Sequence, residues 1–232
     1  MKKIDIGKYK GPNANTRRIR TISRRLEKLH GPFVPKEKLD PVEELVLTLL
    51  SQATSDLNRD RAYKNLMETF HGWDDILNAN VKTIEATIRE GGLARNKSRA
   101  LKKILKEVKD RYGGWNLGDI GTMPIDEAVE ELSSLPGVGV KTAACVLVFA
   151  YHRPVIPVDT HVHRLSARLG LTTEKASAVH AYHVLMSIVP EKLRYPFHLQ
   201  IITHGRRVCK AQRPKCGECP LVDICPAAEI FE

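Results

Sequence analysis

The sequence predicts an all-α fold, and three observations support this prediction. Apolar residues recur at helical spacing through most of the chain, as in Ile19, Ile22 and Leu26. Residues that start and stop helices, such as the pair Asp40-Pro41, flank many of these segments. No stretch gives four clean alternations of apolar and polar residues between turns, so strands should be few.

The boundary signals place the helices in order. The first is expected to begin after Asn15, which can cap it, and to end before Gly31. In the second, Asp40 is the cap, Pro41 is the first helical residue, and the apolar run 45–50 indicates burial. Further helices are expected over 55–70, 73–78, 81–90, 97–112, 125–132, 140–150, 160–169, 175–188 and 191–208.

The composition is that of a globular protein. Of the 232 residues, 42% are hydrophobic and 28% are charged, which excludes wholesale disorder. No run approaches the roughly 20 apolar residues of a membrane helix, and no secretory signal follows the first residues. We therefore expect a cytoplasmic protein.

The net charge of +10 is unevenly distributed. Residues 1–30 hold ten Lys or Arg and two acidic residues, whereas residues 31–190 are neutral as a whole. Within that neutral part, residues 89–111 hold nine bases and three acids, and we expect these bases on the outer face of their helix. Clustered positive charge indicates a polyanionic partner such as nucleic acid. The alternative is a basic protein with ordinary solvated helix faces.

A glycine-rich turn, Leu135-Pro136-Gly137-Val138-Gly139, separates two of the expected helices. Its glycines permit a tight turn, and the unpaired amides of the next helix form an anion site. A dinucleotide-binding loop and a P-loop are both excluded, because the preceding strand and the required glycine spacing are missing. A helix–hairpin–helix that binds a nucleic-acid backbone fits the pattern. An ordinary turn between two helices is the alternative.

Two charged residues after this turn are candidates for chemistry. Lys141 begins an apolar helix, where loss of hydration and the helix dipole favour a neutral amine able to form Schiff bases. Asp159 ends an extended stretch that contains Pro154 and Pro157, and a carboxylate there can stabilise a cation or accept a proton. The simpler alternatives are a phosphate-binding lysine and an aspartate that only caps a helix.

Four of the five cysteines lie within 17 residues near the C-terminus. Cys209, Cys216, Cys219 and Cys225 have the spacing C-x6-C-x2-C-x5-C, whereas Cys145 lies in an apolar helix and is expected in the core. Four such cysteines in an intracellular chain indicate a metal site rather than disulfides. Because there is only one close C-x2-C pair, a [4Fe–4S] cluster is favoured over zinc, which remains the alternative.

Together these motifs resemble those of the endonuclease III family of DNA glycosylases. The resemblance rests on the hairpin 135–139 followed by Lys141, on VDTH at 158–161, on LLSQAT at 49–54, and on the cysteine spacing. It spans roughly residues 30–226. No single one of these motifs would identify the family, but their combination is specific.

The resemblance implies two helical lobes that flank a DNA-binding cleft. The central lobe would comprise residues 37–149 and carry the helix–hairpin–helix. The other would combine residues 16–36 with residues 150–232, including the C-terminal iron–sulfur cluster loop. Residues 1–15 would form a basic N-terminal arm.

The resemblance also implies a reaction. The enzyme would flip a damaged base out of double-stranded DNA, and Lys141 would attack the sugar C1′ to form an imine. Asp159 would assist, and β-elimination would then nick the strand. Relatives restricted to base removal lack this lysine, so Lys141 indicates a bifunctional glycosylase and lyase. The implied substrates are oxidised pyrimidines and abasic sites.

The DNA contacts that the resemblance implies come from two loops, the hairpin and the segment after Asp159. Gln52 would fill the gap left by the flipped base, and Leu93 would be inserted into the base stack. Carbonyls of the hairpin, from Ser133 onward, would bind a monovalent cation. As alternatives, Leu93 packs into the core, and the histidine of VDTH only packs or contacts phosphate. The full set of DNA-contacting residues that the resemblance implies is Gln52, Leu93, Leu135, Gly137, Val138, Gly139 and His161.

Departures from the common family pattern leave other functions open. Ser55 stands where an aspartate commonly follows, and His163 replaces an apolar or aromatic residue. A mismatch glycosylase that removes T or U opposite G is one alternative. A non-catalytic iron–sulfur DNA-binding module is another. In every case we expect a nucleoid-associated monomer with no membrane partner.

Overall fold

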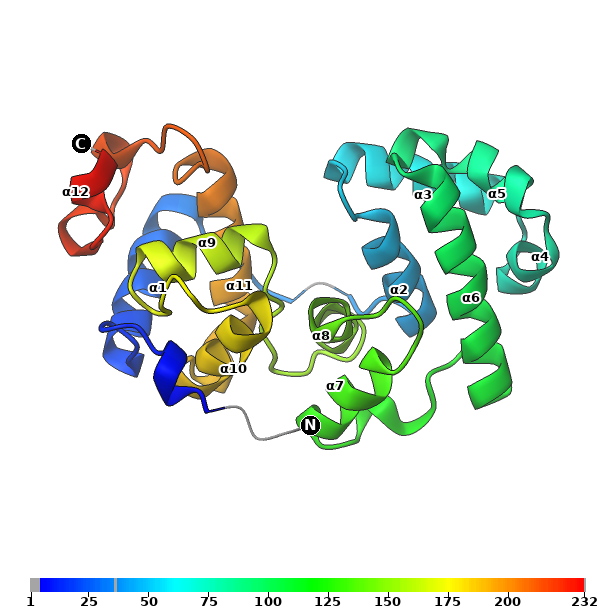
Figure 1. The fold of residues 1–232 in the computed structure, drawn as a ribbon, viewed down its shortest axis with the longest axis horizontal. Coiled ribbons are helices and arrows are strands. Elements are labelled where there is room, and N and C mark those ends of the chain that lie inside the picture. The colour runs from blue at the N-terminus through cyan, green and yellow to red at the C-terminus, as the bar shows by residue number, and fades with distance from the viewer. Residues whose placement is uncertain (1–4, 36, 232) are drawn as a thin grey trace. The chain divides into compact units, whose positions relative to one another are not determined.

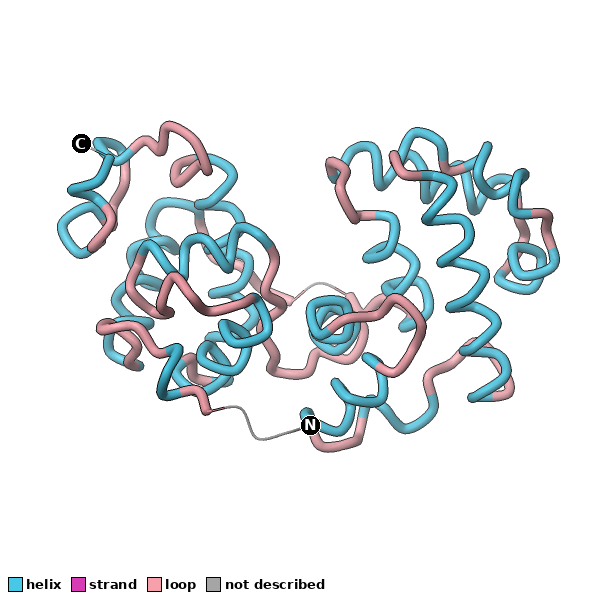
Figure 2. Tube along the Cα trace, in the orientation of Figure 1, coloured by secondary structure: helices cyan, strands magenta, loops and turns pink. Residues whose placement is uncertain are grey.

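The computed structural model describes residues 5–35 and 37–231 of the chain. Helices dominate this part (Figure 1), and it contains no strand (Figure 2). The only β pairing among these residues is an isolated antiparallel bridge between Lys10 and Thr172. The prediction of an all-α fold is therefore confirmed.

The expected helices all form, most within a few residues of their expected ends. Asn15 and Asp40 cap the first two helices with their side chains, as their positions predicted. The α-helices are α1 (Thr16–His30), α2 (Pro41–Leu50), α3 (Asp56–Thr69), α4 (Trp73–Asn78), α5 (Val81–Thr87), α6 (Ala94–Tyr112), α7 (Ile125–Ser133), α8 (Val140–Phe149), α9 (Thr160–Arg168), α10 (Ala178–Ile188), α11 (Glu191–Arg207) and α12 (Ala228–Phe231).

Two helix starts differ from the prediction. The helix expected from residue 97 begins at Ala94, directly after Leu93, which has left-handed backbone angles. The helix expected from residue 175 begins at Ala178, because the Ser177 side chain accepts a hydrogen bond from the His180 amide and caps it there. The four-residue α12 was not expected, since so short a helix leaves no periodic pattern in the sequence.

The described residues divide into two compact units. The first contains the residues up to 37 together with those from 154 onward, and the second contains residues 38–153. Each unit is held together by its own buried apolar residues.

In the first unit, α11 packs against both α1 and α9. Ile19, Ile22 and Leu26 of α1 are fully buried, in agreement with their helical spacing. The approach of α11 to α9 requires a glycine, because a Cβ on Gly205 would lie 2.9 Å from the His161 Nδ1 atom.

Most of the basic N-terminal arm is docked onto the first unit. The amides of Gly11 and Asn13 donate hydrogen bonds to the carbonyls of Leu171 and Gly170. A Cβ on Gly11 would lie 2.3 Å from the Gly170 carbonyl oxygen, so the arm packs as closely as backbone permits. Residues 1–4 of the arm lie outside the described residues.

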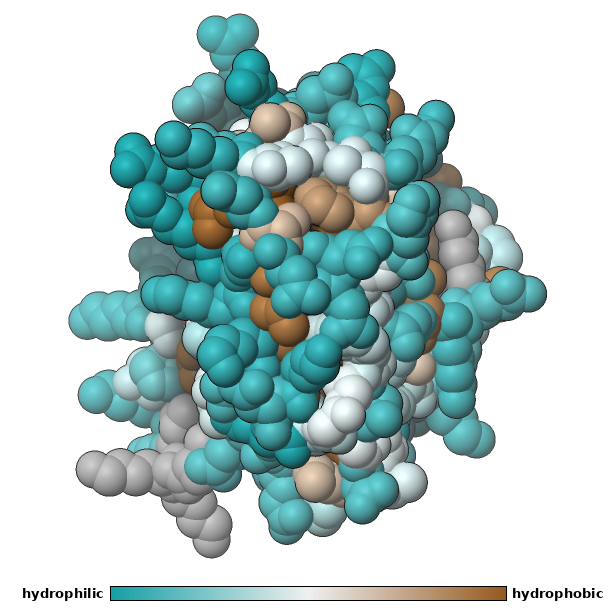
Figure 3. All heavy atoms as spheres, turned by 90° about the vertical axis from the view of Figure 1, so that its right-hand side faces the viewer, coloured by the Kyte–Doolittle hydropathy of each residue, from teal (hydrophilic) through white to brown (hydrophobic). Residues whose placement is uncertain are grey.

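In the second unit, α8 packs against α2 and α7. Seven consecutive residues of α8, Thr142–Val148, are buried, which makes it the central helix of this unit. Figure 3 shows the face that carries α4 to α6, where most side chains are hydrophilic and the hydrophobic ones form small separate patches.

One prediction about α6 is wrong. Most of its bases are solvent-exposed or half-exposed, but Lys97 is only 2% exposed and points into the second unit. Lys97 thus occupies a position on the buried face of the helix, where an apolar side chain is usual.

Candidate functional site

The helix–hairpin–helix predicted around residue 137 consists of α7, a tight turn and α8. Gly137 has φ of 79°, a conformation that favours glycine, and the Val138 amide donates to the Leu135 carbonyl across the turn. Gly139 caps α8 without a side-chain hydrogen bond, so the first amides of α8 have no side-chain acceptor. A Cβ at either glycine would meet no atom within 4 Å. The hairpin therefore presents open backbone and helix amides suited to a phosphate.

Lys141 lies in the first turn of α8, next to this hairpin, and is half-buried. Cys145 lies one helical turn further on and is 4% exposed. Burial raises the pKa of Cys145 to about 11, so the thiol stays protonated. Lys141 therefore lies at the edge of the buried part of α8.

A buried carboxyl group lies beside these residues. Glu44 of α2 is 6% exposed, and its Oε1 accepts a hydrogen bond of 2.8 Å from the Thr48 hydroxyl. Burial raises the pKa of Glu44 to about 7; the Thr48 hydrogen bond and the positive charges of Lys141 and Arg59 oppose this rise, and Glu43 adds to it. Glu44 therefore changes protonation near neutral pH.

Two exposed loops of the second unit lie side by side. Gln52, after α2, is exposed, and Leu93, before α6, is 58% exposed. The Lys97 ammonium donates hydrogen bonds of 2.7 Å to the Leu50 carbonyl and 2.8 Å to the Gly91 carbonyl. Lys97 thereby ties together the two loops that carry Gln52 and Leu93.

Asp159 and His161 belong to the first unit. Asp159 is half-buried and caps α9, with its side chain accepting a hydrogen bond of 2.7 Å from the Val162 amide. His161 is half-buried, and its Nδ1 lies 3.2 Å from a guanidinium nitrogen of Arg164. Desolvation and the charges of Arg164 and Arg206 lower the pKa of His161 against the opposing charge of Asp159. The capping role of Asp159 leaves one carboxylate oxygen for chemistry.

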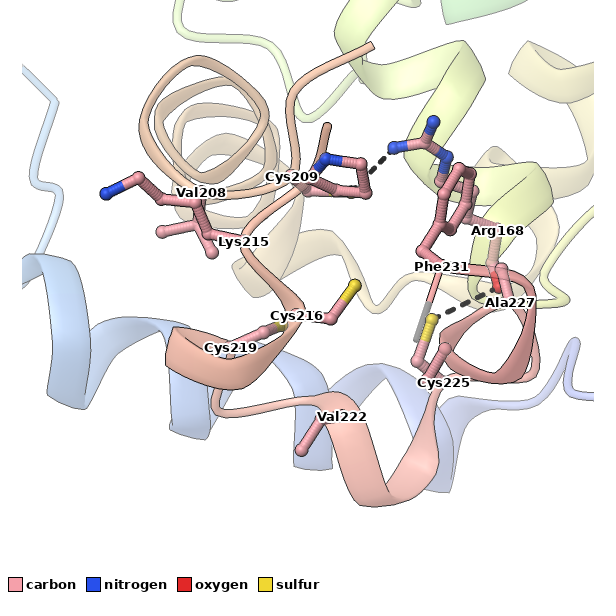
Figure 4. A pocket seen from close by; sticks show the side chains of 12 residues that line it. Arg168, Val208, Cys209, Lys215, Cys216, Cys219, Val222, Cys225, Ala227 and Phe231 are labelled. Atoms are coloured by element: carbon pink, nitrogen blue, oxygen red, sulfur yellow. Dashed lines mark hydrogen bonds between the residues drawn. The ribbon is translucent and has the colours of Figure 1, made fainter. Parts of the chain in front are cut away.

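The four clustered cysteines line one pocket of the first unit (Figure 4). None of them forms a disulfide. Arg168 and Phe231 also line this pocket. Within the described part of the chain, no three His, Cys, Asp or Glu side chains converge on a single-ion position. Four thiols spread around one pocket fit a multi-iron cluster, which has several iron atoms to ligate.

Further side chains hold the cysteine segment in place. Arg168 of α9 donates to the Cys209 sulfur at 3.3 Å and to the Lys210 carbonyl at 2.7 Å. Arg25 of α1 donates to the Pro220 carbonyl and pairs with Asp223. Each of these contacts joins a helix to the cysteine segment, which has little regular structure of its own.

A pair of histidines reaches one of the cysteines. His204 of α11 is 1% exposed, with Nε2 at 3.3 Å from the Cys219 sulfur and Nδ1 at 3.2 Å from His30 Nε2. Burial lowers the pKa of His204 to about 4, so the ring is neutral near pH 7. The His204 ring thus lies within hydrogen-bonding distance of both His30 and the Cys219 sulfur.

Sequence reasoning missed Glu44, Lys97 and His204. Lys97 lies on an amphipathic helix, where a charged residue is ordinarily on the solvent face, and Glu44 lies in the first turn of a mostly buried helix, where acidic residues are common. A sharper use of the helical period would have found both, since each occupies the apolar stripe of its helix. The contact of His204 with Cys219 joins separate elements and has no local signal.

Comparisons with known proteins define the family. Residues 46–191 match the model of the HhH-GPD superfamily of base excision DNA repair proteins. Residues 209–225 match the iron-sulfur binding domain of endonuclease III. The chain belongs to the HhH-GPD superfamily of base excision DNA repair proteins, and its cysteine segment is an iron–sulfur binding domain of the endonuclease III type.

Individual relatives agree with this assignment. Endonuclease III of Thermotoga maritima is 35% identical over 82% of this chain and 84% of its own length. Endonuclease III of Bacillus subtilis is 37% identical over 80% of this chain and 81% of its own length. A solved structure of a trapped endonuclease III–DNA covalent intermediate is 33% identical, covers 93% of this chain and 98% of its own, and superposes with a TM-score of 0.80.

These similarities confirm the family predicted from the motifs, its role in base excision repair as a DNA glycosylase and lyase, and the iron–sulfur site. No helix among the described residues is both long and apolar enough to cross a membrane.

Proposed function

We propose that this chain is a bifunctional DNA glycosylase and abasic-site lyase that removes oxidised pyrimidines from double-stranded DNA. The observation that carries the proposal is the position of Lys141 in the first turn of α8, the second helix of the hairpin. The open hairpin backbone suits a DNA phosphate, so a lysine in the adjacent turn is well placed to reach a sugar.

In the proposed reaction, the neutral Lys141 amine attacks the sugar C1′ of a flipped nucleotide. The new C–N bond forms as the bond from C1′ to the base breaks, and the base leaves with that electron pair. Loss of a proton from nitrogen and ring opening give an imine, and removal of a C2′ proton then expels the 3′ phosphate. Asp159, with one carboxylate oxygen not used in capping, stabilises the positive charge on the sugar or activates the lysine.

DNA would be held by surfaces on both units. In the second unit, Gln52 fills the space left by the flipped base and Leu93 is inserted into the base stack. Both side chains are exposed, and Lys97 holds their two loops together through hydrogen bonds. The hairpin, comprising Leu135, Gly137, Val138 and Gly139, binds phosphate and a monovalent cation through its amides and carbonyls. In the first unit, His161 contacts the backbone near the lesion.

We propose a [4Fe–4S] cluster bound by Cys209, Cys216, Cys219 and Cys225. The four cysteine side chains line one pocket, and four thiolates are the ligand set of such a cluster. When bound, the cluster links the cysteine segment to the helices and supplies no step of base removal, since glycosidic cleavage needs no electron transfer. The arginines that contact the segment fix its position for DNA binding. Because the substrate is chromosomal DNA, we place the protein at the nucleoid.

Borohydride trapping on DNA with one abasic site tests the lysine chemistry. Borohydride reduces the imine to a stable covalent adduct, which we expect with the wild-type protein and not with Lys141→Ala. The matched control Lys175→Ala removes an exposed lysine and should form the adduct as the wild type does. An intact, iron-loaded wild-type protein that gives no adduct would exclude the lyase and favour a non-catalytic DNA-binding module.

A panel of duplexes, each with one lesion, tests the substrate class. We expect cleavage at oxidised pyrimidines such as thymine glycol and little cleavage at T or U opposite G. The reverse order of rates would assign the chain to mismatch repair on the same scaffold.

A further inference from the structure

The C-terminal helix α12 borders the pocket that the four clustered cysteines line. Ala228 of this helix is 7% exposed and Phe231 is 41% exposed, and both line the pocket together with Ala227. These residues follow Cys225 but lie beyond the match to the iron–sulfur binding domain, which ends at that cysteine. The proposed reaction gives them no task.

The Phe231 ring packs on Arg168 of α9. The guanidinium carbon lies 4.5 Å from the ring centroid, within the range of a cation–π contact, and Figure 4 shows the two side chains next to each other. Both residues belong to the first unit. The ring therefore fixes the end of α12 to a longer helix of the same unit.

The same arginine also holds the beginning of the cysteine segment. Its guanidinium donates to the Cys209 sulfur at 3.3 Å and to the Lys210 carbonyl at 2.7 Å. Its backbone carbonyl oxygen lies 3.5 Å from the Cys225 sulfur. Arg168 thus contacts the first and the last of the four cysteines, and the Phe231 ring lies over the guanidinium that makes two of these contacts.

The backbone of α12 is held less firmly than its ends. The Ala228 amide donates to the Cys225 carbonyl at 3.0 Å, and the Ile230 amide donates to the Ala227 carbonyl at 3.2 Å. A helix of four residues is too short to be stable alone, so side-chain contacts decide whether α12 stays against the pocket. Loss of the contact at Phe231 should therefore open this side of the pocket more often.

We propose that α12 is a cover for the iron–sulfur cluster and that the contact of Phe231 with Arg168 keeps this cover closed. The inference rests on the proposed cluster, because the cover protects bound iron. Chelators remove metal from such segments, and solvent exposure is one of the properties of a cluster that the protein controls. The cover slows the loss of iron by keeping small dissolved molecules away from the cysteine sulfurs.

The rate at which a chelator bleaches the cluster tests this proposal. The iron-loaded protein is mixed with excess EDTA in the absence of oxygen, and the loss of visible absorbance is followed with time. We expect Phe231→Ala to bleach about 2- to 5-fold faster than the wild type, the change that loss of an exposed cation–π contact produces in the open population. Phe231→Tyr keeps a ring over the guanidinium and should bleach at the wild-type rate.

Ile230→Ala is the matched control. Ile230 precedes Phe231 on the same helix, is 74% exposed and does not line the pocket. Its replacement also removes a large apolar side chain from α12, but it should leave the bleaching rate unchanged. Phe231→Leu keeps an apolar side chain without an aromatic face and should bleach faster than Phe231→Tyr.

Hydrogen exchange of the backbone amides shows whether the cover itself opens. In the iron-loaded protein we expect the amides of residues 228–231 to exchange faster in Phe231→Ala than in the wild type, while those of α9 keep their wild-type rates. Iron content is measured before each experiment, and a variant that is purified with part of its iron is reconstituted first. Each rate then describes a fully loaded protein.

The outcomes distinguish the cover from the proposed cluster. A wild type that binds zinc and no iron overturns the cluster itself. An iron-loaded wild type whose bleaching and hydrogen exchange match those of Phe231→Ala overturns only the cover, and so does an equal acceleration of bleaching in Ile230→Ala.

Discussion

At the scale of single residues, Lys97 shows how a buried charge can serve a loop rather than a reaction. Leu50 is the last residue of α2, so its carbonyl lacks a partner within the helix and carries the negative end of the helix dipole. The Lys97 ammonium satisfies that carbonyl and also the one of Gly91. Burial lowers the pKa of Lys97, and two carbonyl acceptors offset part of that desolvation.

Lys97→Met tests this arrangement. Methionine fills the space but leaves two carbonyls without a donor, each worth about 1–3 kcal/mol when buried, so we expect a loss of roughly 2 kcal/mol or more. Chemical denaturation measures the loss, and Lys103→Met on the exposed face of the same helix should change stability by less than about 0.5 kcal/mol. Equal stability of the two variants would show that water satisfies the carbonyls.

At the scale of elements, local signals predicted the helices well because each signal acts within one turn. Asn15, Asp40, Ser55 and Asp159 all cap helices through their own side chains. The same logic missed the start of α6, since Leu93 is left-handed although glycine or asparagine would be expected there. No local pattern in the sequence encodes this conformation.

The candidate site was predictable only in part, for the same physical reason. Lys141 and the cysteines belong to short motifs, so their types and spacing are visible in the sequence. The burial of Glu44 depends on how α2 packs against α8, and the contact of His204 with Cys219 depends on how α11 meets the cysteine segment. Such contacts arise from tertiary packing, which periodicity does not specify.

The cysteine segment is the element whose folding depends most on its ligand. It has two short 3-10 turns, Cys216–Glu218 and Val222–Ile224, and few buried apolar side chains, so its metal supplies much of its stability. We expect Cys216→Ser to lose iron and visible absorbance and to become sensitive to proteolysis within this segment. Cys145→Ser, outside the segment, should keep wild-type iron content. Full iron content in Cys216→Ser would mean that another group ligates the cluster.

At the scale of the whole molecule, the net charge of +10 does not describe a uniform field. The N-terminal 30 residues hold most of the excess, and part of it is neutralised locally, as where Arg25 pairs with Asp223. Other bases, including Lys210 and Arg213 in the cysteine segment, are exposed. DNA affinity should therefore depend on which bases contact phosphate and little on the total charge.

The salt dependence of binding to undamaged DNA shows whether affinity depends on particular phosphate contacts or on total charge. Each phosphate contact contributes about 0.9 to the slope of log affinity against log salt concentration, because a bound phosphate releases its counterions. If Lys210 and Arg213 contact phosphates, the double variant Lys210→Gln/Arg213→Gln should flatten the slope by about 1 to 2 and weaken binding most at low salt. Lys64→Gln/Lys82→Gln removes the same charge from exposed positions outside the basic segments and should leave the slope unchanged. The two double variants have the same net charge and differ only in which bases are removed. If the slope changes equally in both, total charge governs binding and local contacts do not.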